Sequence, residues 1–272
     1  MITNIATDKL SLSLWDYTDG YIVSDIEGLG PVNAEFTSSD YALHDGSRLQ
    51  WARRGTRNIV ITVDLVVGHP TKTVSQLRSE IYREFLPKMP VTITVSRSDG
   101  PDLYIDCHVE STEAVIFSQE PKVTISLVAF DPDFRRGEDQ TVNFPGGGSL
   151  KNVSVTIDYE GTTATGFVFT LAPTNLEVQG GFSLQSVSEY GTETFVYTQP
   201  ILYYPPYVLD TRPGTRSILS DGASVLQGVE YGSDWIQLYP GQNTVTFTRI
   251  GGTVGSGNYN ASITYPILES YV

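Results

Sequence analysis

Apolar and polar residues alternate along most of this chain, which is the pattern of strands that bury one face. The clearest case is residues 91–96, where Val91, Ile93 and Val95 alternate with polar residues. In the first half the pattern predicts strands over residues 58–67, 91–96, 103–109 and 122–130. The first of these starts as an alternating run and ends continuously apolar, so we expect it to be buried on both faces. The turn at residues 98–101 predicts that 91–96 and 103–109 form a hairpin.

One segment of the first half follows a helical pattern instead. Apolar residues recur there at helical spacing: Val74, Leu77, Ile81 and Phe85. Thr73 is a suitable N-cap, and Gln76 three residues later completes a capping box. Pro87 and Pro90 then prevent the helix from continuing. The first half is therefore predicted to contain β-sheet and a single helix.

The second half shows only strand-like segments, separated by turn residues. They are residues 153–159, 166–171, 184–187, 192–197, 225–231, 235–238, 244–250 and 260–265. Short strands at this spacing, without helices between them, predict a β-sandwich or jelly roll. Gly146, Gly147 and Gly148 follow Pro145 directly, and such a run has no side chains to pack. We therefore expect a first domain over 1–145 and a second over 146–272.

Composition and charge narrow the classes of protein further. Hydrophobic residues make up 40% and charged residues 18% of the 272 residues, as in folded proteins. The net charge of −14 argues against a protein whose general surface grips DNA. A single cysteine, Cys107, excludes an intrachain disulfide and a thiolate zinc cage. With no apolar run near the roughly 20 residues that span a bilayer, we expect a soluble protein made in a reducing cytoplasm.

The sequence contains only weak candidates for catalytic groups. Cys107 and His108 are adjacent, so in a strand their side chains point to opposite faces and cannot pair; a pair of Cys107 with His44 or His69 remains open. Asp210 and Asp234 flank aromatic residues and could serve a glycan hydrolase, which needs two carboxyls within about 10 Å. Each also has a structural role available, such as an Asx turn or ion pair between Asp210 and Arg212. Nothing in the sequence indicates a catalytic, cofactor or metal site.

Tyrosines near the middle of the second half are candidates for contact with a partner. Tyr203, Tyr204 and Tyr207 surround two prolines and are assigned to an outward contact surface. Trp235 and Tyr239 could add to a sugar-stacking platform, but aromatic residues of an all-β domain are more often core, and we assign Trp235 to the core.

Four arginines form the densest basic cluster in this acidic chain: Arg48, Arg53, Arg54 and Arg57. They could contact nucleic acid, line a solvated loop, or meet carboxylates of a neighbouring subunit. The acidity of the rest of the chain favours the subunit interface, as expected for a ring of identical copies.

Several turn motifs, taken in order, resemble those of a known family. In the first half they are Ile26-Glu27-Gly28-Leu29-Gly30-Pro31, His44-Asp45-Gly46 and Arg53-Arg54-Gly55-Thr56-Arg57. In the second half they are Leu209-Asp210-Thr211-Arg212-Pro213-Gly214, Asp221-Gly222 and Leu238-Tyr239-Pro240-Gly241-Gln242-Asn243. Their order and spacing resemble the distal tail (Dit) family, which are hub proteins of siphophage tails.

This resemblance implies a mainly β protein: an N-terminal belt domain of β-sheets with one helix, then a C-terminal galectin-like β-sandwich. It implies a non-enzymatic structural hub in the virion, at the phage tail tip, made in the host cytoplasm. Six copies would form a ring around the DNA channel, with the tail tube protein on one face and a tail-associated lysin or tip and fibre protein on the other. DNA would pass without specific binding, and no cofactor or membrane is expected. The alternatives are a carbohydrate-binding adhesion module of a tail tip, another tail-tube or baseplate protein, and a glycan hydrolase.

Overall fold

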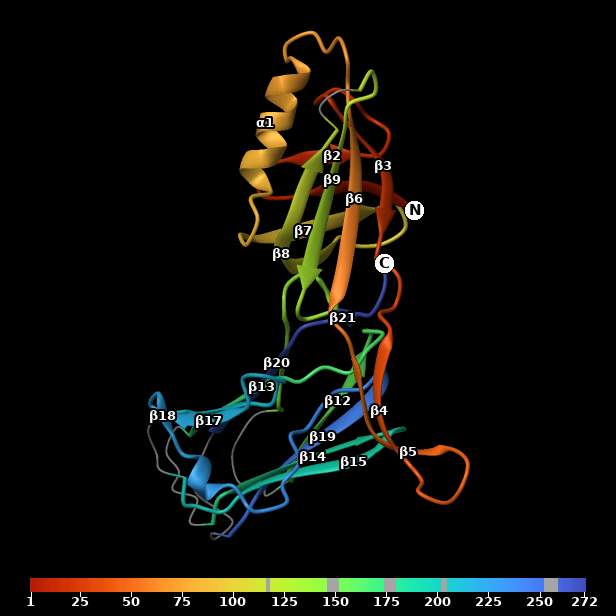
Figure 1. Ribbon diagram of the computed structural model, residues 1–272. Helices are drawn as coiled ribbons and strands as arrows, with labels where there is room; N and C mark the ends of the chain where they lie inside the picture. Colours follow the sequence, from red (N-terminus) through yellow and green to blue (C-terminus); the bar gives the residue numbers. More distant parts are fainter. Residues whose placement is uncertain (116–117, 146–151, 174–179, 202–204, 252–258) are drawn as a thin grey trace. The chain divides into compact units, whose positions relative to one another are not determined.

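Alternating apolar residues place nearly all of the regular secondary structure of the described residues in antiparallel strands. The computed structural model describes residues 1–272 except 116–117, 146–151, 174–179, 202–204 and 252–258 (Figure 1). The chain divides into two compact units, Met1–Gly137 together with Glu269–Val272, and Glu138–Leu268. Each unit has its own hydrophobic core. The mainly β fold predicted from the sequence is confirmed.

Unit 1 is built on one nine-stranded antiparallel sheet. Its main path runs β2 (Ser11–Ser13), β1 (Ile2–Ala6), β7 (Pro90–Arg97), β8 (Leu103–Ala114), β9 (Lys122–Ala129), β6 (Arg57–Leu65) and β3 (Tyr21–Glu27). The short strands β10 (Phe134–Arg136) and β21 (Leu268–Glu269) extend it beside β8. Because the edge strands β2 and β3 lie close together, the sheet nearly closes on itself. The predicted hairpin of β7 and β8 is confirmed.

The helix of unit 1 forms where its pattern predicts it. Helix α1 (Val74–Glu84) lies beside the sheet, as Figure 1 shows, and turns Leu77 and Ile81 into the core. Thr73 accepts a hydrogen bond from the backbone of Gln76, whose side chain in turn accepts from the Thr73 backbone, so the predicted capping box is present. Among the described residues, no helix has the length and apolarity needed to cross a bilayer.

Strand β6 differs from its prediction in length and burial. It ends at Leu65, and its residues alternate between buried and partly exposed instead of being buried on both faces. The reason is that the nearly closed sheet has one inner, packed face and one outer face. Val67, which seemed to continue the strand, lies in the following turn and is exposed.

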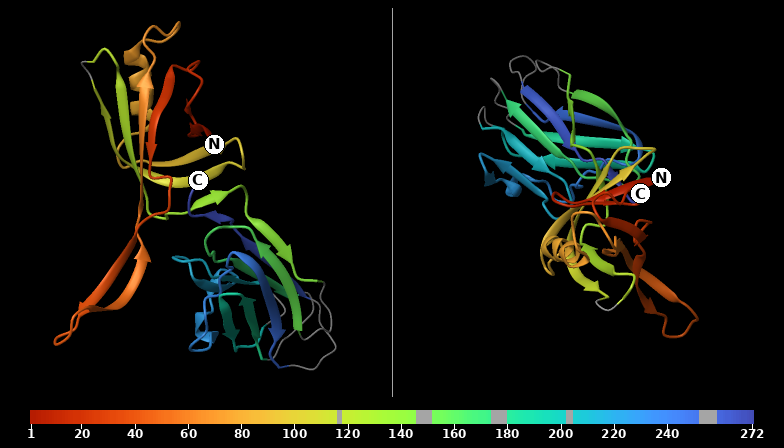
Figure 2. Two further views of the ribbon diagram at one scale, coloured as in Figure 1. Left: turned by 90° about the vertical axis from the view of Figure 1, so that its right-hand side faces the viewer. Right: turned by 90° about the horizontal axis from the view of Figure 1, so that it is seen from above.

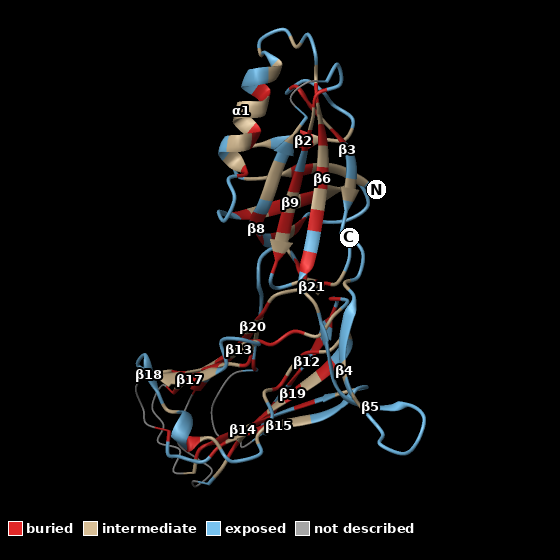
Figure 3. Cartoon of the chain, viewed as in Figure 1, coloured by how far each residue is buried: buried red, intermediate tan, exposed pale blue. Residues whose placement is uncertain are grey.

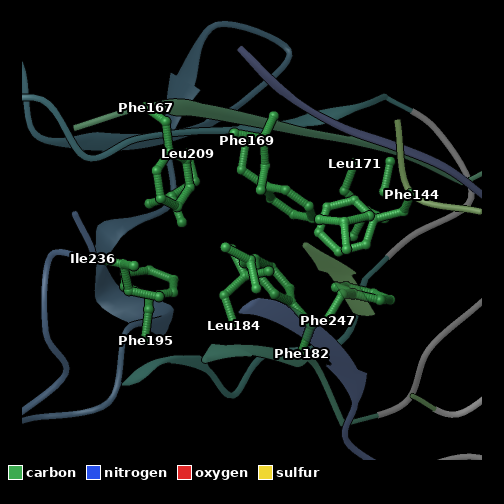
Figure 4. Packing of buried hydrophobic residues seen from close by; sticks show 14 of the residues in the cluster. Phe144, Phe167, Phe169, Leu171, Phe182, Leu184, Phe195, Leu209, Ile236 and Phe247 are labelled. Atoms are coloured by element: carbon green, nitrogen blue, oxygen red, sulfur yellow. The ribbon is translucent and has the colours of Figure 1, made fainter. Parts of the chain in front are cut away.

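Unit 2 packs two antiparallel sheets against each other as a β-sandwich. One sheet runs β11 (Gln140–Asn143), β20 (Tyr259–Tyr265), β13 (Val168–Pro173), β16 (Tyr207–Asp210), β17 (Ser217–Ser220) and β18 (Ala223–Ser224). The other runs β12 (Asn152–Tyr159), β19 (Gly241–Arg249), β14 (Phe182–Ser188) and β15 (Gly191–Tyr197). Between them lies a cluster of aromatic rings, in which Phe247 contacts Phe144, Phe169, Phe182 and Tyr259 (Figure 4).

Two predicted strands of unit 2 do not form. Residues 225–231 contain a short 3-10 helix, η1 (Leu226–Gly228), and residues 235–238 make only an isolated bridge from Leu238 to Thr165. This segment runs along the edge of β15 and bonds to it partly through side chains. The Ser233 hydroxyl accepts from the Val196 backbone, and an Asp234 carboxylate oxygen accepts from the Thr194 backbone. The loop thus covers a strand edge that would otherwise be open.

The two units divide earlier in the sequence than predicted. The division falls at Gly137 and Glu138, not at 145/146, because β11 already pairs with β20 of unit 2. Residues 269–272 return to unit 1, where the Val272 backbone donates to the carbonyl of Leu29. The glycine run at 146–148, which suggested the boundary, lies outside the described residues.

Candidate assembly interface

A β-hairpin that is not part of the core of unit 1 is the most exposed element of that unit. Its strands, β4 (Ala34–Asp40) and β5 (Ser47–Arg54), pair only with each other in the described structure, and every residue of β5 is exposed. We call this hairpin the arm. Figure 2 shows it as an orange ribbon leaving the sheet, and in Figure 3 it is almost entirely pale blue, the colour of exposed residues. A two-stranded ribbon alone in water is only marginally stable.

One face of the arm carries a short apolar stretch, between Arg54 at its base and Asp40 and Ser47 near its tip. Phe36 lies opposite Ala52, and Leu49 lies opposite Ser38, on the same face as Phe36 because the extra residue Gln50 forms a bulge between them. Phe36 is 68% and Leu49 57% exposed. This pairing places apolar side chains on a face that no described part of the chain covers.

The opposite face carries charge and an aromatic ring: Glu35, Thr37, Arg48, Trp51 and Arg53. Arg53 donates to Glu35 at 2.7 Å and its guanidinium lies over the Trp51 ring, 5.3 Å from the centroid. This pair is well exposed, so it contributes little to stability. Arg48 is exposed on the same face.

Arg54 fixes the base of the arm to unit 1. Its guanidinium makes two hydrogen bonds of 2.5 Å to the two oxygens of Asp133, whose side chain is 4% exposed. Hydrogen bonding to Asp133 raises the pKa of Arg54. Of the four arginines assigned to a subunit interface, Arg54 thus already has its partner inside the same chain.

Arg57 is buried, not exposed on an interface. It is 1% exposed and donates to four backbone carbonyls, those of Gly28, Gly30, Pro132 and Ser270, at 2.6 to 2.7 Å. The guanidinium also lies 4.6 Å from the ring centroid of Phe134. Burial lowers the pKa of Arg57. Arg57 therefore joins three segments of unit 1, and only Arg48 and Arg53 remain available to a neighbouring subunit.

The tyrosines assigned to an outward surface are placed differently from the prediction. Tyr203 and Tyr204 lie outside the described residues. Tyr207 is buried in the core of unit 2, where its ring packs 5.8 Å from that of Tyr197. It begins β16 at an inward position, so the contact surface cannot include it. Trp235 is partly buried against Phe195, as expected of a core residue.

The candidate catalytic carboxylates serve the structure around them. Asp210 accepts from the backbone and guanidinium of Arg212, as predicted. Burial alone would raise the pKa of Asp210, but the bonds from Arg212 hold it below its usual value. Asp234 covers the edge of β15, as described above. Cys107 is buried and His108 exposed, on opposite faces of β8 as expected, and the described residues contain no group of three or more His, Cys, Asp or Glu able to hold a metal.

A groove of about 340 Å³ opens on the surface of unit 1 near the end of α1. Leu86 and Met89 line it and are each about half exposed, and Pro90 and His108 form part of its wall. Phe130, 69% exposed, contacts the His108 ring edge to face at 5.5 Å. The lining also includes charged residues, so the groove offers both apolar and charged contacts: Asp8, Lys9, Arg83, Glu84 and Asp106.

The sequence reasoning found the arginines of the arm but missed the arm itself. The signal is present, because residues 34–40 and 47–54 both carry alternating residues around the Asp45-Gly46 turn. The alternation is weak, since Ser38 and Ser39 interrupt it.

Comparisons with known proteins give a likeness in structure only. No family model and no curated protein matches the sequence. Among solved structures, the crystal structure of the Dit protein of phage SPP1 matches 98% of this chain and 99% of its own, with a TM-score of 0.65 and 15% identity. That protein is described as a paradigm of the hub adsorption apparatus in phages that infect Gram-positive bacteria. Two structures of the phage p2 baseplate in its activated conformation, with Sr and with Ca, match 96% of this chain and 97% of theirs at 10% identity and a TM-score of 0.41. Over nearly its whole length, this chain therefore has the fold of SPP1 Dit, and the resemblance to distal tail proteins predicted from the turn motifs is confirmed at the level of the fold.

Proposed function

We propose that this chain is a non-enzymatic hub protein of a phage tail tip, six copies of which close a ring around the DNA channel. In the virion the ring would join the tail tube protein on one face to a tail-associated lysin or tip and fibre protein on the other. The observation that carries the proposal is the arm, whose apolar face is uncovered in a single chain. The likeness of the fold to SPP1 Dit supports it.

The arm is suited to a contact that repeats around a ring. Phe36 and Leu49 are exposed on the arm, and Leu86 and Met89 are exposed apolar residues that line the groove of the same unit. We propose that the arm of one copy covers this groove on the next. The contact joins two different surfaces, and such head-to-tail contacts generate rings when the rotation closes.

Removing the apolar residues of the arm should dissolve the ring. We expect the Phe36→Ser/Leu49→Ser double variant to be monomeric under conditions where the parent chain forms rings of six, as measured by native mass spectrometry and negative-stain electron microscopy. A matched control is Leu226→Ser, which removes a leucine of similar exposure from unit 2. Rings from the double variant, or a parent chain that stays monomeric at high concentration, would contradict the proposal.

Cysteine cross-linking should identify the groove as the receiving surface. In the Leu49→Cys/Met89→Cys variant, mild oxidation should give a ladder of covalently linked chains. The thiol at position 49 of each copy would meet the thiol at position 89 of one neighbour, and its own thiol at position 89 would meet the other neighbour. The native Cys107 should stay silent, since burial raises its pKa to about 12 and keeps it protonated. Leu226→Cys/Met89→Cys serves as the control. If the rings form but the ladder does not, the groove assignment is wrong while the hub proposal stands.

DNA should pass such a hub without being held. The chain carries 31 acidic and 17 basic residues, so it lacks the excess of cations that neutralises phosphates in non-specific binding. We expect duplex DNA to show no binding by fluorescence anisotropy even at about 50 mM salt, where electrostatic binding is strongest. Saturable binding that weakens steeply with added salt would contradict this part of the proposal.

A further inference from the structure

A stacked pair of tyrosines stands at the rim of the unit 2 sandwich. Tyr190 lies in the turn between β14 and β15, and its ring is nearly parallel to that of Tyr239, with centroids 5.1 Å apart and planes at 22°. Tyr190 is 61% exposed, whereas Tyr239 is partly buried. One face of the Tyr190 ring therefore rests on Tyr239 and the other faces solvent.

The lower ring of the pair is fixed from several directions. The Tyr239 hydroxyl donates to a carboxylate oxygen of Glu193 at 2.8 Å. The buried Asn243 side chain accepts from the Tyr239 backbone at 2.9 Å and donates to its carbonyl at 2.7 Å. Burial and the contact with Glu193 raise the pKa of Tyr239 to about 12, so the hydroxyl stays protonated and donating at neutral pH. The platform is thus formed before any ligand arrives, which lowers the entropy cost of binding.

The surroundings of the pair are polar and acidic. The second oxygen of the Glu193 carboxylate accepts from the backbone of Gln237 at 2.7 Å. Glu189 precedes Tyr190 in the turn and Thr192 follows near the start of β15, and both are exposed. An aromatic residue that anchors a protein partner usually lies among other apolar groups that become desolvated on binding. The polar residues around Tyr190 do not provide such surroundings. Hydroxyl and carboxylate oxygens around an open ring instead suit a ligand with one apolar face and many hydroxyl donors.

We propose that Tyr190, supported by Tyr239, is a stacking subsite for a neutral pyranose unit of a glycan. The C–H groups on one face of the sugar would lie on the open face of Tyr190, and its hydroxyls would donate to the nearby oxygens. Glu189 and Glu193 disfavour anionic sugars by like-charge repulsion. This inference is independent of the ring, since it concerns unit 2 alone.

The test is binding of defined oligosaccharides to the full-length chain. The probes are neutral hexasaccharides of glucose, mannose, galactose and N-acetylglucosamine, with oligogalacturonate as the anionic comparison, each titrated by isothermal calorimetry and by NMR shifts of the tyrosine rings. We expect at least one neutral hexasaccharide to bind and oligogalacturonate not to bind. Tyr190→Ala should weaken binding about two- to tenfold, the range expected for losing one aromatic stack, and Tyr190→Trp should keep it.

Tyr231→Ala provides the matched control, because Tyr231 is fully exposed and has no ring contact in the described structure. It should bind like the parent chain. All three variants should keep the parent's thermal unfolding temperature within a few degrees, so that lost binding is not lost folding. The proposal is overturned if none of the neutral hexasaccharides binds, or if Tyr190→Ala binds as tightly as the parent.

Discussion

Replacing Arg57 with methionine should destabilise unit 1 by about 3 kcal/mol. Methionine fills a similar volume but leaves four carbonyls without the charged donor that now joins them, and hydrogen bonds to a charged group contribute about 1.5–3 kcal/mol each. Two effects keep the expected loss of stability below the sum of four such hydrogen bonds. Gly28 and Gly30 lie in exposed loops, so their carbonyls can bind water instead. Removing a buried cation also removes the cost of its desolvation. Urea unfolding followed by hydrogen exchange of individual peptides measures the loss and locates it in unit 1.

Arg53→Met is the matched control for this result. It makes the same substitution four residues away, on the exposed arm, and should change the free energy of unfolding by less than about 1 kcal/mol. Equal free energies of unfolding for Arg57→Met and Arg53→Met would show that the hydrogen bonds from Arg57 to the four carbonyls do not stabilise unit 1.

Replacing Phe247 with alanine should destabilise unit 2 by about 3–5 kcal/mol. The ring is 1% exposed and contacts four other aromatic rings, so its removal loses both the transfer free energy and the packing around a cavity. Because the two cores are separate, hydrogen exchange should rise in β12, β14 and β19 and stay unchanged in α1.

A smaller truncation of the same side chain tests whether the loss of stability follows the size of the cavity. Phe247→Leu leaves a smaller cavity and should lose clearly less stability than Phe247→Ala. If both variants unfold at the parent's urea midpoint, the aromatic cluster is not what stabilises the sandwich.

Local rules predicted the elements that depend on nearby residues. The capping box of Thr73 and Gln76 and the alternation in β7 set their own structure, so sequence alone was sufficient to place α1 and the β7–β8 hairpin. The strand expected at residues 225–231 does not form, because residues 226–228 turn into a 3-10 helix and the segment meets β15 only through the isolated bridge of Val229 with Tyr197 and a few backbone bonds.

The candidate site depended on contacts between distant residues, and there the sequence was a poorer guide. Arg57 looked like its charged neighbours, yet its partners come from residues 28 to 270. Tyr207 looked exposed beside two prolines, yet the register of β16 turns it inward. The arm was missed because its apolar residues have no core to face, and Ser38 and Ser39 interrupt the alternation that marks its two strands.

The return of residues 269–272 to unit 1 sets an order of events during synthesis. The Ser270 carbonyl is the last of the four acceptors of Arg57 in the sequence. The ribosome adds Ser270 only after all of residues 138–268, which form unit 2. Domains usually finish folding in the order in which they are translated. Here the first unit to emerge is the last to be completed, because unit 1 stays unfinished until residue 270 has left the ribosome.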